Sequence, residues 1–380
     1  MRDDRIHDAG RLMDAFAVRT GIGSAGDPAR RYLWTDAYAV MAWLGLWRAT
    51  GEELHLDRAL RTVDLVHHHL GRHRPDDARD GWISGLGESA GRARPTAGGL
   101  RIGKMLPERA AGQPLEEHLE WRRDGQYFHY LTRWMHALHR LTVFTGDARW
   151  IRMAVDLGCA AHTGFVHEHG PRGSKRIHWK MSIDLSRPLV DSMGHLDPLD
   201  GLVAFGAVRA LDRHGNSTLD SLDMAVADMQ RICMEIPDWA TADPLGLGGL
   251  LMETAQLGEL SVAGEVATDG LLPRLHRDAL RGLAAFAGSR RLFEPLEDRL
   301  AFRELGLALG LRALGDAPAV ERYMPVVERI EETWRYPAAQ ALTGWGSHLD
   351  INAVMLACAL VPDAVLTPVA DAAQSRLGGG

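Results

Sequence analysis

The chain has 380 residues, of which 46% are hydrophobic, and a formal net charge of −7. This length and hydrophobic content suffice for one large core or two ordinary ones. An acidic chain lacks the basic surface that nucleic-acid binding needs, so we expect no nucleic-acid partner. The charged start MRDDRIHDAG is unlike a secretion signal, and no window approaches the ~18 consecutive apolar residues of a membrane span. These features predict a cytoplasmic protein without a membrane partner.

The cysteines point to the same compartment. Cys159, Cys233 and Cys358 are odd in number, far apart, and each lies within an apolar helical pattern. We therefore expect reduced thiols in the core rather than disulfides.

Apolar residues recur at helical spacing along the chain, and strand signals are nearly absent. The segments form pairs. The first helix of each pair is apolar nearly all round and should be buried, whereas the second has a charged face and should be half-exposed. The N-terminal segment pairs with the last one. In chain order the predicted helices cover residues 5–21, 35–51, 53–71, 127–146, 147–165, 197–215, 219–236, 243–260, 271–289, 298–316, 319–335 and 344–362.

Twelve helices in six hairpins fit either an open superhelical solenoid or a closed double ring. A solenoid has two exposed ends that need polar caps. The last helix, with the run AVMLACALV, is as apolar as the middle ones, which favours closure. We predict a single all-α domain over residues 1–380, an (α/α)6 toroid of six inner and six outer helices.

Two long segments interrupt the helical pattern, at about 74–125 and 167–186. Loops of this length in a compact domain are usually functional. Both precede a predicted inner helix, so we expect two lids at one end of the ring, which would be the mouth of a cavity. A short tail is expected at about 366–380.

The first turns of the inner helices should form the wall of this cavity, where ligands commonly bind. Asp36 follows Trp34 in a first turn, and capping of the helix is the alternative role for this acid. Asp124 and His129 occur in RRDGQYFHYLTRWMHALHRL, a polar stripe on an otherwise apolar helix that needs partners or a ligand. No metal site is predicted, because His136 and His139 lack a third ligand. The other expected wall residues are Tyr127, Trp134, His136, Trp179, His195, Trp345 and His348.

The stretch RPLVDSMGHLDPLDGL contains three acids. Asp197 and Asp200 are interpreted as the start of a helix. Asp191 precedes that start and follows an apolar Leu-Val pair, so we expect it in a partly apolar mouth. A carboxyl in such a place has a raised pKa and can act as a general acid. His195, four residues on, would tune it, and arginines and lysines of the lids would clamp a carboxylate on the substrate.

The hairpin pattern, with turns such as FTGDARW, resembles the six-hairpin glycosidase superfamily. LWTDAYAVMAWLGLWRATG and PLVDSMGHLDPLDGL are similar to segments of the unsaturated glucuronyl hydrolases. That resemblance implies that Asp191 protonates the double bond of an unsaturated uronic acid, to which water then adds. A second acid of that family has no counterpart here, since Tyr130 follows His129, and this leaves Asp124 or Asp36 for the role. The predicted substrate is a uronic-acid-containing oligosaccharide, with no cofactor, and the protein is expected as a monomer or homodimer.

Two alternatives remain open. The N-acylglucosamine 2-epimerases share the toroid, and the resemblance to them implies a pair of catalytic histidines, for which His348 and His195 are the candidates. A ring of helices can also serve as a non-catalytic ligand-binding or scaffold module. The two lids and the polar stripe favour an enzyme over a scaffold.

Overall fold

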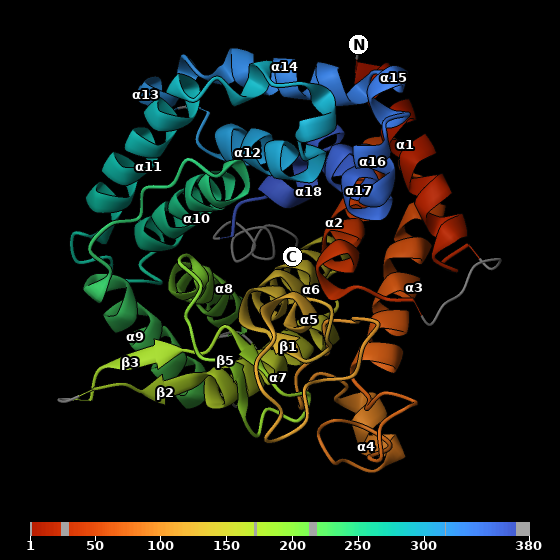
Figure 1. Ribbon diagram of the computed structural model, residues 1–380, viewed down its shortest axis with the longest axis vertical. Helices are drawn as coiled ribbons and strands as arrows, with labels where there is room; N and C mark the ends of the chain where they lie inside the picture. Colours follow the sequence, from red (N-terminus) through yellow and green to blue (C-terminus); the bar gives the residue numbers. More distant parts are fainter. Residues whose placement is uncertain (1, 24–29, 171–172, 213–218, 316, 370–380) are drawn as a thin grey trace, which may run out of the picture. The chain divides into compact units, whose positions relative to one another are not determined.

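The structure is a computed structural model that describes residues 2–23, 30–170, 173–212, 219–315 and 317–369. The chain is mainly helical, and each of the twelve helices predicted from the sequence is present (Figure 1). The predicted tail at 366–380 lies mostly outside the described residues. Within the described part of the chain, no helix combines the length and apolarity needed to cross a bilayer.

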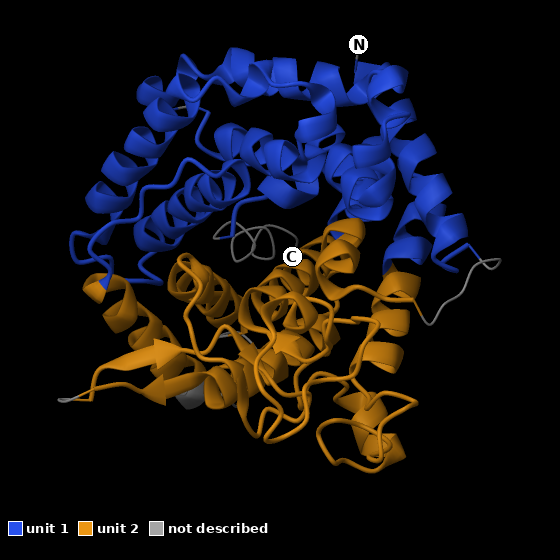
Figure 2. Ribbon diagram, viewed as in Figure 1, with its two compact units in different colours: residues 1–26, 41–59, 236–371 blue, residues 27–40, 60–235, 372–380 orange. Residues whose placement is uncertain are grey.

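The chain divides into two compact units, which are coloured separately in Figure 2. Unit 1 comprises residues 1–26, 41–59 and 236–371, and unit 2 comprises residues 27–40, 60–235 and 372–380. Helices α2 (Leu33–Thr50) and α3 (Glu53–Leu70) contribute residues to both units.

Unit 1 is built around α12, which packs against α10, α14 and α17, while α1 packs on α17 and α11 on α10. Its long helices are α1 (Arg2–Arg19), α10 (Pro244–Val262), α11 (Leu271–Gly288), α12 (Ala301–Ala313), α14 (Met324–Arg335) and α17 (Leu349–Leu360). Short helices connect them: α13 (Pro318–Glu321), α15 (Pro337–Gln340), α16 (Thr343–Ser347), α18 (Asp363–Leu366) and the 3₁₀ turns Arg291–Phe293 and Leu296–Asp298.

In unit 2, α6 and α8 pack against each other, α7 packs on both, and α9 packs on α7 and α8. The long helices are α6 (Phe128–Thr145), α7 (Ala148–Phe165), α8 (Asp197–Asp212) and α9 (Leu219–Glu235). Every residue of α8 is buried, whereas α7 buries one face, as the sequence pattern predicts. Gly146 ends α6 with φ +72°, a left-handed conformation that glycine adopts without strain.

The two insertions both belong to unit 2 and contain structure that the sequence did not predict. The first carries the short helices α4 (Glu88–Ala93) and α5 (Glu117–Glu120). Strands β1 (Gln126–Tyr127), β4 (Lys180–Met181) and β5 (Pro188–Val190) form one small antiparallel sheet, in the order β1-β4-β5. Strands β2 (Val166–Glu168) and β3 (Lys175–Ile177) form a separate antiparallel pair.

Candidate active site

Four polar side chains meet where the first turns of α6 and α8 pack together in unit 2. His129 and Arg133 are four residues apart on α6, so they project from one face of that helix. Asp197 and Asp200 stand in the first turn of α8. The Arg133 guanidinium donates to Asp200 Oδ1, and His129 Nδ1 lies 3.8 Å from Asp197 Oδ1. The cluster therefore contains one hydrogen-bonded ion pair, Arg133–Asp200, and one close contact without a hydrogen bond, His129–Asp197.

Burial shifts the pKa values of Asp197 and His129 in opposite directions. Burial, reinforced by the charge of Asp200, raises the pKa of Asp197 to about 8. Burial lowers the pKa of His129 to about 4. Among the described residues, neither His129 Nδ1 nor Asp197 Oδ2 has a hydrogen-bond partner. Two titratable groups whose environments separate their pKa values in this way are a common mark of an acid–base site.

A glycine permits the position of the Asp197 carboxyl group. The Asp197 backbone N–H donates to the carbonyl of Gly194 at 3.2 Å. A Cβ atom at Gly194 would lie 2.5 Å from both Asp197 carboxyl oxygens. Any larger residue there would have to push the carboxyl group away, so Gly194 contributes to the site by being small.

Aromatic rings extend from the cluster into the two insertions. The ring of Tyr127 stacks on His129, with centroids 5.6 Å apart, and on Trp179 at 5.3 Å. Trp179 in turn meets the edge of Trp121 at 4.7 Å. These rings help to enclose a cavity of about 250 Å³, which is lined by Leu115, Glu117, Glu120, Trp121, Tyr127, Trp179, Val190 and Ser192.

Two further tyrosines adjoin this aromatic row. The hydroxyl groups of Tyr32 and Tyr130 lie 2.5 Å apart, and the Tyr130 ring contacts both Tyr127 and His129. Burial raises the pKa of the Tyr130 phenol, which keeps this hydroxyl group protonated at neutral pH. Tyr32, Tyr130, Arg133 and Trp121 were not predicted as site residues, although the polar stripe of α6 pointed toward two of them.

Asp191 does not lie where the sequence analysis placed it. Its side chain is 84% exposed, and its Oδ1 lies 3.6 Å from His178 Nδ1. The flanking residues Val190 and Ser192 line the aromatic cavity, and extended backbone directs successive side chains to opposite sides. Asp191 therefore points away from the cavity. We expected this acid in a partly apolar mouth, but its side chain is exposed to solvent.

Asp124 and Asp36, the two candidates for a second acid, hold the backbone in place. The Asp124 side chain is fully buried and accepts hydrogen bonds from Arg101, from Arg74 at 3.3 Å and from the Gly103 N–H at 2.9 Å. Asp36 is also buried and accepts from the Tyr32 N–H at 3.1 Å. A carboxylate whose lone pairs are already bonded is a poor general acid, so the structure assigns both acids to local folding.

Three predicted wall residues are buried. Trp134 is fully buried, and its indole N–H donates to His67 Nε2 at 3.0 Å. His136 is 4% exposed, and burial lowers its pKa well below the usual value. Trp34 is 7% exposed and packs on Tyr38. All three side chains are therefore largely shielded from solvent, and their place on a cavity wall stays a prediction.

The remaining predicted residues are divided between the units. His195 is exposed in unit 2. Trp345 and His348 belong to unit 1, where Trp345 packs on Trp334 and the exposed His348 lies beside Phe302. Among the described residues there is no group of three or more His, Cys, Asp or Glu side chains arranged to hold a metal ion.

Comparison with known proteins supports the fold. No family model and no curated protein matches the chain. Among solved structures, the chain is similar to the cellobiose 2-epimerase from Spirochaeta thermophila DSM 6192, with a TM-score of 0.55 and 14% identity, over 94% of this chain and 98% of that chain. Likeness at this identity shows the fold alone, and it confirms the predicted all-α class of the (α/α)6 toroid type.

Proposed function

We propose that this chain is a carbohydrate-active enzyme that moves a proton on a reducing sugar, in the isomerase and epimerase class. The observation that carries the proposal is the contact between Asp197 and His129, two groups with oppositely shifted pKa values beside an aromatic cavity. The likeness in fold to a sugar epimerase supports the same class.

In the proposed reaction, Asp197 is the base and His129 the hydrogen-bond donor. The Asp197 carboxylate takes the proton from the carbon next to the carbonyl group of the open-chain sugar, and the electron pair of that C–H bond forms a C=C bond. The carbonyl oxygen gains the negative charge, and the neutral imidazole of His129 donates to it. A carboxyl group with a pKa of about 8 is a strong base for a carboxylate, and a neutral histidine suits an oxyanion.

Arg133 would stabilise the charge of the enediolate, because it lies one helical turn from His129 on α6 and its charge acts on that residue. Its own charge is balanced by Asp200, which keeps the site close to neutral before the substrate ionises. A fixed cation near a developing oxyanion stabilises the transition state more than the ground state.

The return of the proton decides the product. Asp197 and His129 lie only 3.8 Å apart, so both act from one face of a bound sugar. Return from Asp197 to the former carbonyl carbon gives a ketose, once a proton has passed from the hydroxyl group on the original carbon to the former carbonyl oxygen. Return to the original carbon from the opposite face gives the epimer and needs a second proton donor there. The common enediol step is therefore the one assigned to this pair.

The aromatic rings would hold the sugar. Trp121 is 53% exposed, and the faces of indole rings pack well on the C–H groups of pyranoses. The hydrolase prediction has weaker support. It rests on Asp191, which is exposed, and the similar structure is that of an epimerase.

The test is proton exchange in D₂O, followed by NMR at carbon 2 of glucose, N-acetylglucosamine and cellobiose. We expect deuterium at that carbon in at least one sugar, at a rate that rises as Asp197 ionises toward pH 8. Asp197→Asn and His129→Asn should each lower the rate by roughly 10²–10⁴-fold, while Asp191→Asn, the matched control, keeps it.

Two results would contradict the proposal. One is exchange that is unchanged in both Asp197→Asn and His129→Asn. The other is cleavage of an unsaturated uronyl disaccharide that is lost in Asp191→Asn, since this outcome would restore the hydrolase prediction.

A further inference from the structure

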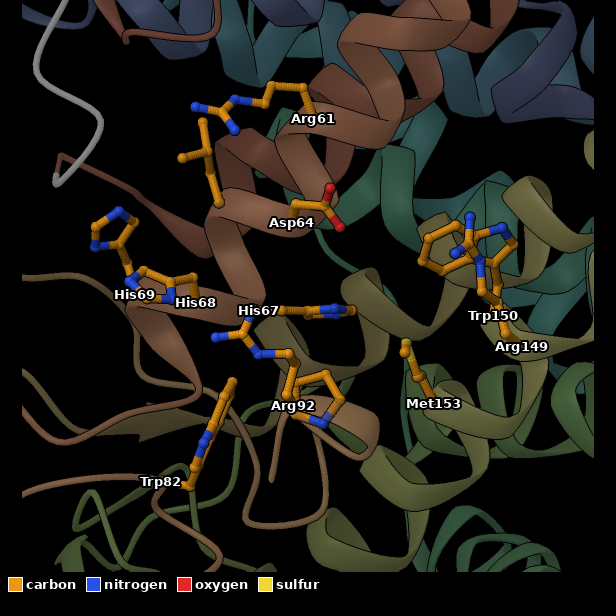
Figure 3. Close-up of a pocket in the computed structure, with 12 residues that line it drawn as sticks. Arg61, Asp64, His67, His68, His69, Trp82, Arg92, Arg149, Trp150 and Met153 are labelled. Carbon is orange, nitrogen blue, oxygen red and sulfur yellow. The ribbon is translucent and has the colours of Figure 1, made fainter. Parts of the chain in front are cut away.

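A second cavity in unit 2 lies apart from the residues proposed for sugar chemistry. It has a volume of about 600 Å³ and is formed by the C-terminal half of α3, the α4 segment and the start of α7 (Figure 3). Its lining residues are Arg61, Asp64, Leu65, His67, His68, His69, Trp82, Arg92, Pro95, Arg149, Trp150 and Met153. This volume is in the range that binds small organic molecules.

The floor of the cavity is apolar and fixed. Leu65, Trp82 and Trp150 are each at most 6% exposed. Trp82 is held by the guanidinium of Arg72, 4.3 Å from its ring, and by the backbone of Gly91, where a Cβ atom would lie 2.2 Å from the indole. A rigid apolar floor favours a ligand with an apolar body, because no side chain must be ordered on binding.

The charged groups of the cavity are mainly cationic. Arg61, Arg92 and Arg149 line it, against a single acid, Asp64. Burial raises the pKa of Asp64, and Arg149 and Arg61 oppose that shift. His67 adds no charge, because burial lowers its pKa to about 3 and its Nε2 accepts a hydrogen bond from Trp134.

Arg92 and Arg149 can turn toward a ligand at a small cost in free energy. Arg92 pairs with Glu88 at 3.1 Å and Arg149 with Asp147 at 2.8 Å, and all four side chains are more than 40% exposed. Exposed ion pairs contribute at most about 1 kcal/mol, so an anion in the cavity competes with them readily. A guanidinium also binds a carboxylate through two parallel hydrogen bonds.

One lining residue carries a buried donor that lacks an acceptor. Trp150 is 3% exposed, and among the described residues no atom accepts a hydrogen bond from its indole Nε1–H. Buried donors are rarely left unpaired. The guanidinium of Arg149 lies 4.1 Å from the same ring, which places a cation beside the apolar floor of the cavity.

We propose that this cavity is a binding site for a small organic carboxylate, whose apolar body rests on Leu65 and the two tryptophans while its carboxylate is bound by Arg149, the guanidinium that lies beside the Trp150 ring. The site is separate from the Asp197 cluster, and its occupation does not depend on the proposed enzyme activity.

The test is a titration of the full chain with benzoate, monitored by tryptophan fluorescence and by the indole N–H signals in NMR. Benzyl alcohol supplies the same body without the charge, and inorganic phosphate supplies an anion without the body. We expect benzoate to bind at least tenfold more tightly than either. Arg149→Gln should weaken benzoate binding about tenfold, which corresponds to about 1.4 kcal/mol.

Arg152→Gln is the matched control, since Arg152 is an exposed arginine on the same helix but is not among the lining residues. It should leave the affinity unchanged. Both changes are at exposed positions, and circular dichroism checks that the variants fold. The proposal is overturned if benzoate does not bind, if benzyl alcohol or phosphate binds as tightly, or if Arg152→Gln weakens binding as much as Arg149→Gln.

Discussion

The chemistry of a single side chain in this protein depends on the few ångströms around it. Asp191 and Asp197 are six positions apart in one acidic stretch, yet one side chain is 84% exposed and the other 6%. Burial without a hydrogen-bonded cation makes the ionised form of a carboxyl group costly, so its pKa rises. The acid with the raised pKa is therefore Asp197, whereas Asp191 is a solvent-exposed surface residue.

The raised pKa of Asp197 predicts a pH-dependent stability. The folded pKa of about 8 exceeds the ordinary value of 3.8, so the folded state binds the proton more tightly, and this contribution is lost as pH rises toward 8. His129 acts in the opposite sense, but only between about 4 and 6.5. From pH 6.5 to 8 we expect the free energy of unfolding to fall by about 1.5 kcal/mol through Asp197 alone.

Urea denaturation of the wild type and of Asp197→Asn at these two pH values checks this prediction. The variant cannot ionise and should lack the decrease, while every other titrating group is common to both proteins. A decrease of equal size in both proteins would show that Asp197 already ionises at low pH in the folded state.

At the scale of elements, the two insertions are joined by buried charges. The ammonium group of Lys180 is fully buried and donates to Glu120 Oε1 at 2.8 Å, to the Glu120 carbonyl at 2.8 Å and to the Arg123 carbonyl at 2.9 Å. Glu120 directly precedes Trp121, and Lys180 directly follows Trp179. A buried ion pair contributes little net stability but can fix the register of two segments, and here it sets the edge-to-face contact of the two indoles.

Lys180→Met should therefore damage both stability and the aromatic cavity. Among the described residues, it leaves the buried Glu120 carboxylate with Arg109 as its one cation partner, at 3.0 Å. Removing one partner of a buried pair costs about 3–5 kcal/mol. We expect a loss in this range by urea denaturation, together with weaker exciton-coupled circular dichroism from the indole pair.

The double variant Lys180→Met, Glu120→Gln removes both buried charges and should recover most of the stability without restoring the indole signal. Lys175→Met is the control, because Lys175 is a partly exposed lysine of the same insertion that pairs with Asp228. A loss below about 1 kcal/mol for Lys180→Met would show that the pair is not needed to join the insertions.

The molecule as a whole contains a buried thiol in each compact unit. Cys358 belongs to unit 1 and Cys233 to unit 2, and both are fully buried, while Cys159 is partly exposed. Helices α2 and α3 contribute residues to both units. Loss of either unit would therefore remove packing from a helix that also serves the other, which favours a single cooperative transition.

Thiol labelling at increasing urea concentrations tests this cooperativity. We expect Cys358 and Cys233 to become reactive at the same urea midpoint and Cys159 to react first, as the internal control for reagent access. A separate, lower midpoint for either buried thiol would show that its unit unfolds independently.

The sequence alone was sufficient for the helices and their burial. Periodic apolar residues determine which face of a helix is buried, and this signal is local, so the fully buried α8 and the one-sided α7 were both predictable. The short strands were not, because β1 and β4 contain only two residues each and exist through pairing between distant segments.

The site depended on tertiary structure for the same reason. The sequence identified His129 as a candidate and interpreted Asp197 only as the start of a helix, and nothing local says that α6 and α8 bring the two within 3.8 Å. Likewise, Asp191 directly follows β5. The pairing of that strand with a distant segment sets which side of the chain each side chain faces. Helix formation is decided by neighbours in the chain, whereas the pKa and contacts of a polar group are decided by neighbours in space.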